Sequence, residues 1–317
     1  MNITNEYNKV HNIDFLNNNL PDKCAKLIIA DPPYYKTKGD FDFIWKTFED
    51  YLVDVEKWCL ECKRILADNG TLLWYGGSKN IAYAQIIFDK HFNLINNLTW
   101  NKGSFMGLEE SEGLRSFAPC TERILMYENF NDCKDGFEPS YIRDYFQKYL
   151  MDERKKAGLN TKDINRICGY SENTRNKIIN NEKNWIFITE KSYNLLAIET
   201  GFFNKPYEQL RQEYKDLRRT FNNRFNLQEV LNFSNEAAKV GNKYEHDTVK
   251  PETLTRALIL TCSRENDLVI VPFSGSGTEC AMSAKEKRPF IGYEITEKHA
   301  IMSQKRADAI LKEPTLF

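Results

Sequence analysis

The chain has 317 residues, of which 41% are hydrophobic and 28% charged, and its 44 Lys and Arg nearly balance its 45 Asp and Glu. This composition excludes a disordered chain, and no apolar run approaches the ~20 residues of a transmembrane helix. The polar N-terminus is unlike a signal peptide, and eight scattered cysteines fit reduced thiols, so we expect a soluble, cytoplasmic protein. The length predicts about two domains, or one domain with an insertion.

Residues 1–138 alternate strand and helix patterns. The apolar run 27–30 predicts a buried strand that ends at Asp31-Pro32-Pro33, because proline cannot donate to a ladder. Apolar positions at helical spacing predict a helix over 48–65, closed by Asn69-Gly70. Further strands are predicted at 71–75, 94–100 and 122–127, and a helix at 80–90. This rhythm predicts an α/β fold with a doubly wound, mostly parallel sheet.

Residues 139–228 show helices without strands and form a helical insertion. Between positions 141 and 225 there are 17 Lys and Arg against 11 Asp and Glu, which leaves a net charge of +6 there and −7 elsewhere. Such a basic segment is typical of a surface that faces an anion, although a solvated helical surface explains it equally well. Residues 229–317 resume the alternation. Helices are predicted at 252–263 and 278–287, strands at 268–272 and 290–295, and then a last helix.

A glycine-rich turn, Pro272-Phe273-Ser274-Gly275-Ser276-Gly277-Thr278, separates a predicted strand from a helix. Glycine lets the backbone approach a ligand closely, and free N–H groups at a helix start favour polar or negative groups. Glu294 lies at the carboxyl end of the next predicted strand, where doubly wound sheets place an acid that accepts from ribose hydroxyls. The Walker lysine is missing after the last glycine, which favours a nucleoside-type cofactor over a triphosphate. Without Glu294, a plain strand-to-helix turn would explain the glycines equally well.

A second motif, Asp31-Pro32-Pro33-Tyr34, directly follows the first buried strand. A rigid turn is one interpretation, because Asp-Pro and Pro-Pro both punctuate chains. The other is chemical. A planar amino group could donate to Asp31 and to a loop carbonyl while its ring stacks on Tyr34, as suits a base flipped out of a duplex.

Together these motifs resemble the DNA amino-methyltransferases that use S-adenosylmethionine, in the β-class order with the catalytic motif before the cofactor motif. The same order includes Trp100-Asn101-Lys102, the stretch 121–125 (Thr-Glu-Arg-Ile-Leu) and the stretch 246–251 (His-Asp-Thr-Val-Lys-Pro). The resemblance covers both α/β parts. It implies a Rossmann-like methyltransferase fold, site-specific DNA methylation of the restriction–modification kind, and no metal.

The resemblance also implies roles for single residues. Asp31, Pro32, Pro33 and Tyr34 would hold the target amino group. Residues implied for S-adenosylmethionine are Asp14, Asp31, Lys250, Pro251, Phe273, Ser274, Gly275, Gly277, Thr278 and Glu294. Asp-Pro-Pro-Tyr is typical of adenine N6 enzymes, whereas cytosine N4 enzymes more often begin this motif with serine. We therefore expect adenine in double-stranded DNA as the substrate, with cytosine N4 and RNA as alternatives.

One position departs from the family pattern. The family usually has an aspartate before Pro272, where this chain has Val271. The departure leaves open a catalytically weak or inactive methyltransferase fold that serves as a DNA-binding or regulatory subunit. Related enzymes are often dimeric, so a homodimer is a further possibility that the sequence does not decide.

The stretch 159–178 resembles a helix-turn-helix of the phage-repressor type. Gly169 occupies the turn, and Asn160 and Ser171 are suitable N-caps. Asn173, Asn176 and Lys177 would lie on the exposed face of the second helix and read bases in the major groove. Such motifs usually have a small and an apolar residue where this chain has Asn165 and Arg175. A purely structural helical hairpin therefore remains an alternative.

A second basic stretch, residues 207–221, follows in the insertion. It has Arg211, Lys215, Arg218 and Arg219 at helical spacing, which suits contact with phosphates, although a solvated helix face is an equal alternative. Together the two stretches predict a target-recognition region. Cys59 and Cys62 are spaced like half a zinc site, but no second pair follows, so we expect them to pack in the core.

Overall fold

The computed structural model describes residues 3–36, 42–103, 115, 117, 119–129, 140–179, 185–234 and 249–312. Contacts divide the chain into two compact units, one made of residues 1–130 and 219–317 and the other of residues 131–218. The second unit is the helical insertion, and both of its boundaries lie earlier in the chain than the 139 and 228 expected from the sequence.

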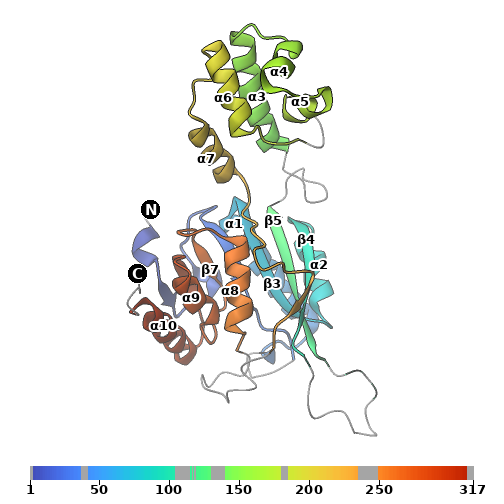
Figure 1. Ribbon diagram of the computed structural model, residues 1–317. Helices are drawn as coiled ribbons and strands as arrows, with labels where there is room; N and C mark the ends of the chain where they lie inside the picture. Colours follow the sequence, from blue (N-terminus) through green and yellow to red (C-terminus); the bar gives the residue numbers. More distant parts are fainter. Residues whose placement is uncertain are drawn as a thin grey trace. The chain divides into compact units, whose positions relative to one another are not determined.

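The larger unit is built on a sheet with eight strands among the described residues, in the order β1-β8-β7-β2-β3-β5-β4-β6 (Figure 1). The strands are β1 (Lys9–His11), β2 (Ala25–Ala30), β3 (Leu66–Gly77), β4 (Phe92–Asn101), β5 (Thr121–Asn129), β6 (Val230–Asn232), β7 (Val269–Val271) and β8 (Phe290–Tyr293). Among the described strands only β5 runs antiparallel to its neighbours. The predicted doubly wound, mostly parallel sheet is confirmed.

Helices cover both faces of this sheet. One face carries α1 (Phe48–Ile65) and α2 (Ile81–Phe88), and the other carries α8 (Glu252–Cys262), α9 (Thr278–Lys285) and α10 (Glu297–Leu311). Two short 3₁₀ helices, Ile3–Glu6 and Phe15–Asn17, flank β1. Thr47 and Asp50 form a capping box that starts α1, which explains where this helix begins.

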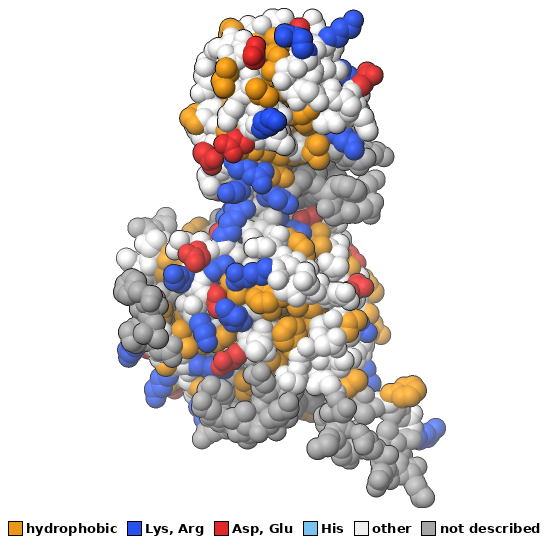
Figure 2. Space-filling view, in the orientation of Figure 1, with side chains coloured by type: hydrophobic (Ala, Val, Ile, Leu, Met, Phe, Trp, Pro, Cys, Tyr) orange, Lys and Arg blue, Asp and Glu red, His pale blue; other side chains and the backbone are white. Residues whose placement is uncertain are grey.

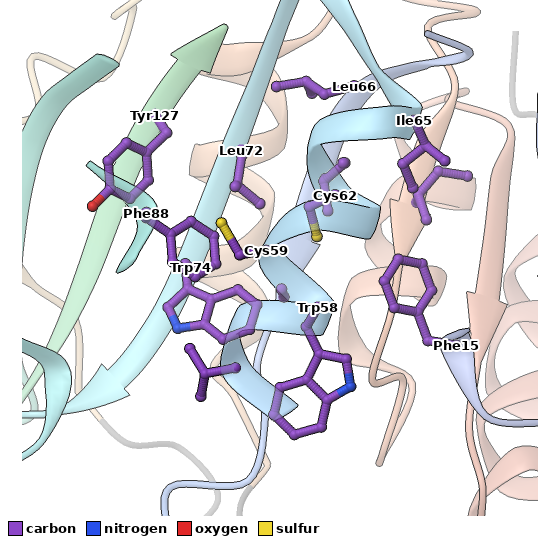
Figure 3. Packing of buried hydrophobic residues seen from close by; sticks show 14 of the residues in the cluster. Phe15, Trp58, Cys59, Cys62, Ile65, Leu66, Leu72, Trp74, Phe88 and Tyr127 are labelled. Atoms are coloured by element: carbon purple, nitrogen blue, oxygen red, sulfur yellow. The ribbon is translucent and has the colours of Figure 1, made fainter. Parts of the chain in front are cut away.

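The core lies in two layers because successive residues of a strand point to opposite faces. Ile28 and Ala30 of β2 face the α1 side, whereas Leu27 and Ile29 face the α8 side. Figure 3 shows the first layer, in which Trp58, Cys59 and Cys62 of α1 pack against Leu72 and Trp74 of β3 and Phe88 of α2. Both thiols are fully buried in this apolar cluster, as the core-packing interpretation expects.

Asn69 and Gly70 do not close α1, contrary to the prediction. The helix ends at Ile65, and β3 begins at the next residue and runs through both positions. The pairing of β2 with β3 shifts register here, and a Cβ on Gly70 would lie 3.0 Å from the carbonyl oxygen of Ala25. The glycine thus marks an irregularity inside a strand, where the backbones approach closely.

The helical unit comprises α3 (Ser140–Lys156), α4 (Thr161–Cys168), α5 (Glu172–Ile179), α6 (Glu190–Thr200) and α7 (Tyr207–Leu217). Its own core includes Phe146, Leu196 and Tyr214. Asn160 caps α4 by accepting from two backbone N–H groups, and Gly169 ends this helix with a φ of 66°. On the face drawn in Figure 2, acidic and basic side chains of this unit are interspersed.

Candidate active site

The site residues come together because the parallel strands end at one edge of the sheet. Asp31 follows β2, the glycine-rich turn follows β7, and Glu294 follows β8. β5 starts at this edge because it runs antiparallel, so Glu122 joins the same cluster. Ligand sites of open α/β sheets lie outside the carboxyl ends of the strands. The candidate site is therefore at this edge.

Asp31 is held by two donors, one on each carboxylate oxygen. The Tyr34 hydroxyl donates to Oδ1 at 2.6 Å, and the Lys250 ammonium lies 2.7 Å from Oδ2. The Asp31 side chain keeps 17% of its surface exposed, whereas that of Lys250 keeps 5%. Pro32 is buried and Pro33 is half-buried. The carboxylate thus combines a fixed orientation with access from outside.

The loop after Asp31 is anchored by its backbone. The Tyr34 N–H donates to Oδ1 of Asp42 at 2.7 Å, and the Asn80 amide donates to the Tyr34 carbonyl oxygen at 3.2 Å. Asp42 is itself buried. These contacts come from segments that local pattern does not connect to the motif, and they keep Tyr34 next to the carboxylate.

Glu122 lies beside Asp31 and links two lysines. Its Oε1 is 2.8 Å from the ammonium of Lys102, and its Oε2 is 3.3 Å from that of Lys250. Oε2 also lies 3.2 Å from the Tyr34 hydroxyl. Two carboxylates and two ammonium groups therefore alternate as Lys102, Glu122, Lys250 and Asp31, so their formal charges cancel.

Burial and these charges set the titration of the cluster. Burial raises the pKa of Asp31 and Glu122 raises it further, while Lys250 opposes both. Burial alone would lower the pKa of Lys250, but the two carboxylates raise it above its ordinary value. Burial, with Asp31 next in size, raises the pKa of Tyr34. Near neutral pH we therefore expect Lys250 to be a cation and Tyr34 a neutral donor.

The glycine-rich turn is partly exposed at two positions. Within residues 268–283 only Phe273 and Gly275 are not buried. Gly277 adopts a φ of 78°, and a Cβ there would lie 2.6 Å from Cα of Ser303. The Thr278 hydroxyl donates to the Lys250 carbonyl oxygen at 3.3 Å. The turn thus requires glycine and contacts the backbone of Lys250.

Glu294 supplies acceptors next to this turn. Its Oε2 accepts from the Gly275 N–H and its Oε1 from the Thr296 N–H, both at 2.9 Å, which leaves further lone pairs on both oxygens. Asp14 follows β1, the parallel neighbour of β8, and its carboxylate caps the 3₁₀ helix after it. Ser274 has a buried hydroxyl with no hydrogen-bond partner among the described residues. The Glu294 carboxylate with its remaining lone pairs, the glycine backbone of the turn and the partly exposed ring of Phe273 together fit a nucleoside-type cofactor.

Val271 lies among apolar side chains. It is fully buried in β7 and belongs to the apolar cluster under α8 and α9. The valine is therefore accommodated as a core residue, and it offers no polar atom to a cofactor. Pro251, which follows Lys250, is also buried and precedes the first residue of α8.

The predicted base-reading residues lie on α5. Asn173 is exposed, whereas Asn176 and Lys177 are half-buried. The Asn176 side-chain oxygen accepts from the guanidinium of Arg175 at 2.8 Å. Arg175 is buried, although the repressor-type pattern has an apolar residue there. Two helices joined by a turn are present here, as both interpretations expect, and Arg175 contacts Asn176 in the second helix.

Only part of the second basic stretch, residues 207–221, lies on α7. Arg211 lies over the rings of Phe187 and Tyr214, at 5.2 and 5.1 Å from their centroids, and Lys215 is exposed. In Figure 2, blue side chains gather over the C-terminal end of α7. The helix ends at Leu217, and Arg218 has extended backbone angles.

Arg219 lies outside this helix, which corrects the helical spacing assigned to it. It belongs to the larger unit, where its guanidinium donates to Oε2 of Glu128 in β5 at 2.8 Å. Glu128 is buried. We therefore leave Arg219 out of the phosphate-contact surface.

Sequence reasoning gave no role to Glu122 or Lys102, although both stand in family motifs. A parallel β5 would have put Glu122 at the opposite edge, so only the strand direction reveals it. Tyr75 and Glu279 were also missed. Each has a buried side-chain oxygen without a hydrogen-bond partner among the described residues. In the 246–251 motif, residues 246–248 lie outside the described residues.

A family model described as DNA methylase matches residues 25–305 of the chain. The chain belongs to this family. It is 26% identical over 311 residues to the type II methyltransferase M.HinfI of Haemophilus influenzae, covering 93% of this chain and 66% of that protein. It is 24% identical over 295 residues to the DNA adenine methyltransferase YhdJ of Escherichia coli K12, covering 91% of this chain and 78% of that protein.

Solved DNA methylases share the fold of this one. The cytosine-N4-specific PvuII DNA methyltransferase superposes with a TM-score of 0.56 at 12% identity, covering 94% of this chain and 85% of that one. M1.HpyAVI, solved as a complex with S-adenosylmethionine, superposes with a TM-score of 0.51 at 15% identity, covering 94% and 98%. In the described part of this methylase, no helix is long and apolar enough to cross a membrane, and no His, Cys, Asp and Glu cluster could hold a metal.

Proposed function

We propose that this DNA methylase transfers a methyl group from S-adenosylmethionine to the N6 amino group of an adenine flipped out of double-stranded DNA. The observation that carries the proposal is the accessible, doubly held Asp31 carboxylate, which lies at the same sheet edge as the cofactor turn. The catalytic residues are Asp31, Pro32, Pro33 and Tyr34.

The chain's part in the reaction is to position the amine and to favour the charge that develops on its nitrogen. The amino lone pair is delocalised into the base, so an oriented acceptor serves better than a strong base. The free lone pairs of Asp31 accept an amino hydrogen, and the carboxylate then takes up the proton that the nitrogen loses. Tyr34 offers a ring for the flipped base.

The cofactor fits the second half of the edge. When bound, S-adenosylmethionine supplies a methyl group activated by its positive sulfonium. Glu294 accepts from the ribose hydroxyls, the backbone at Ser274, Gly275 and Gly277 allows close approach, and Phe273 contributes an apolar surface. Thr278 and Pro251 hold the turn from behind. Asp14 stays assigned to the adenine end of the cofactor.

Adenine is the favoured base. The motif begins with aspartate, and a relative that aligns with 91% of the chain is named a DNA adenine methyltransferase. Cytosine N4 remains the alternative, because the fold alone is also that of an enzyme titled cytosine-N4-specific.

The helical unit serves as the target-recognition region in this proposal. Asn173, Asn176 and Lys177 on α5 read base edges, while Arg211, Lys215 and Arg218 on and after α7 contact phosphates. The exposed amide of Asn173 and the excess of basic residues in this segment support the assignment.

The test uses isotopically labelled S-adenosylmethionine and unmethylated genomic DNA, with mass spectrometry of the digested nucleosides. We expect labelled N6-methyladenine from the wild type and about a 1000-fold loss for Asp31→Ala, because the oriented carboxylate acceptor is removed. Asp68→Ala, which removes an exposed carboxylate of the same unit, is the control. Labelled N4-methylcytosine would overturn the choice of base. DNA binding without any label would support the regulatory-subunit alternative, and labelling of RNA in preference to salt-matched duplex would overturn the DNA assignment.

A further inference from the structure

Lys250 connects the two halves of the site. Its carbonyl oxygen accepts from Thr278 at the start of α9, behind the cofactor turn, while its ammonium lies 2.7 Å from Asp31. The resemblance assigns this lysine to the cofactor. In the structure its ammonium forms an ion pair with the Asp31 carboxylate.

Glu122 is the second anchor of this ammonium. It lies 3.3 Å from the Lys250 nitrogen and is itself tied to Lys102 at 2.8 Å. A lysine with one counter-ion can rotate about its flexible stem, whereas two carboxylates from different elements, the loop after β2 and β5, fix the nitrogen between them. The ring of Trp100, which is 2% exposed, closes off the space at 6.0 Å from the same nitrogen.

We propose that Lys250 and Glu122 are positioning residues for methyl transfer, in which Lys250 fixes the Asp31 carboxylate toward the target amino group and Glu122 holds Lys250 in place. This inference rests on the proposed function. Each carboxylate oxygen has two lone pairs, so Asp31 can take one donor on each oxygen from the protein and still accept from the base.

Held between two donors, the Asp31 carboxylate cannot turn away when the base enters. A misplacement of about 1 Å in such a site can cost about 100-fold in rate. A free ammonium would also repel the sulfonium of the cofactor. The two carboxylates neutralise it, so Lys250 can stand close to a cationic cofactor.

The charged and titratable groups around Asp31 come from five elements. Tyr34 lies in its own loop, Tyr75 in β3, Glu122 in β5, Lys250 before α8 and Glu279 in α9. Lys250 is the cation in direct contact with Asp31. Removing it should raise the pKa of Asp31, by about one to three pH units. Removing Glu122 takes away a second negative charge beside Asp31 and should not raise the pKa of Asp31.

The kinetic test compares Lys250→Met and Glu122→Gln with the wild-type methylase. We expect kcat to fall about 100-fold in Lys250→Met and about tenfold in Glu122→Gln, with the KM for S-adenosylmethionine changed less than threefold. Loss of neutralisation near the cofactor should raise the KM for S-adenosylmethionine, so a lower kcat with little change in KM in Glu122→Gln is diagnostic of positioning. Lys23→Met and Asp68→Asn, which break an exposed ion pair of the same unit, should leave kcat unchanged.

A second readout follows Asp31 itself by ¹³C-carboxyl NMR titration of aspartate-labelled protein without cofactor, assigned with Asp31→Asn. We expect a higher midpoint in Lys250→Met, an equal or lower one in Glu122→Gln, and the wild-type midpoint in Lys23→Met. Unchanged kcat in both site variants would overturn the proposal. A raised KM for S-adenosylmethionine with unchanged kcat would also overturn it and would support a role of Lys250 in binding the cofactor. An inactive wild type would refute the proposed function, while the titration would still decide whether Lys250 holds Asp31.

Discussion

Glu279 is a buried carboxyl directly after the cofactor turn, in the first turn of α9. Its residue is 4% exposed, and Oε1 has no hydrogen-bond partner in the described part of the chain. Burial, with Asp31 as the next cause, raises the pKa of Glu279 to about 7 from an ordinary 4.5. A carboxyl in this state is protonated in the folded chain at pH values where the unfolded chain has already lost the proton.

This shift predicts a pH dependence of stability. Because the folded pKa is raised, the unfolded state releases its proton first, and stability is lost as the pH rises from 4.5 through about 7. Between pH 5 and 8 the wild type should lose about 2 to 3 kcal/mol relative to Glu279→Gln, which cannot titrate. Urea unfolding at both pH values measures the difference. Glu265→Gln, which removes an exposed carboxyl of the same unit, is the control. A pH-independent difference for Glu279→Gln would refute the assigned pKa.

At the scale of elements, the local sequence pattern predicted a strand or its end correctly where one residue type determines it. The apolar run of β2 and the prolines after Ala30 fix a buried strand and its end. Asn69-Gly70 misled because glycine also serves inside a strand, where Leu66 and Ala25 leave no room for a Cβ. The antiparallel direction of β5, and with it the place of Glu122, follows from pairing with β3 and β4 over many residues. Such pairing depends on residues that are far apart in the sequence, so no short segment predicts it.

The cofactor turn offers an element-scale prediction at Gly277. Gly277→Ala combines a φ of 78° with a Cβ 2.6 Å from the backbone of Ser303 in α10, so this helix or the turn must shift. We expect a loss of about 3 kcal/mol in the free energy of unfolding, from left-handed strain plus overpacking.

A matched glycine separates the two causes. Gly103 lies in the same unit with a φ of 84°, and no atom of the described residues lies within 4 Å of where its Cβ would be. Gly103→Ala should therefore lose only about 1 kcal/mol, the conformational part. Equal losses in the two variants, measured by urea unfolding, would show that α10 does not press on the turn.

At the scale of the whole molecule, positive charge is concentrated in one stretch of the chain. The chain carries a net charge of −1, yet the stretch 141–225 carries +6 and the rest −7. Attraction to DNA therefore cannot come from the net charge. Salt also screens electrostatic attraction between exposed charges beyond about 8 to 10 Å. The association must be carried by basic side chains that reach the phosphates directly.

This division gives a salt-dependence prediction for α7. If Arg211 and Lys215 each displace a counterion, Arg211→Gln combined with Lys215→Gln should reduce the slope of log affinity against log salt by about 2. Fluorescence anisotropy of an unmethylated duplex, titrated from low to high salt, measures this slope. Lys23→Gln with Lys57→Gln removes the same charge from exposed positions of the larger unit and should leave the slope unchanged. An unchanged slope for the α7 pair would show that Arg211 and Lys215 lie on a solvated helix surface and do not contact phosphates. Equal losses in both pairs would mean that only the total charge matters.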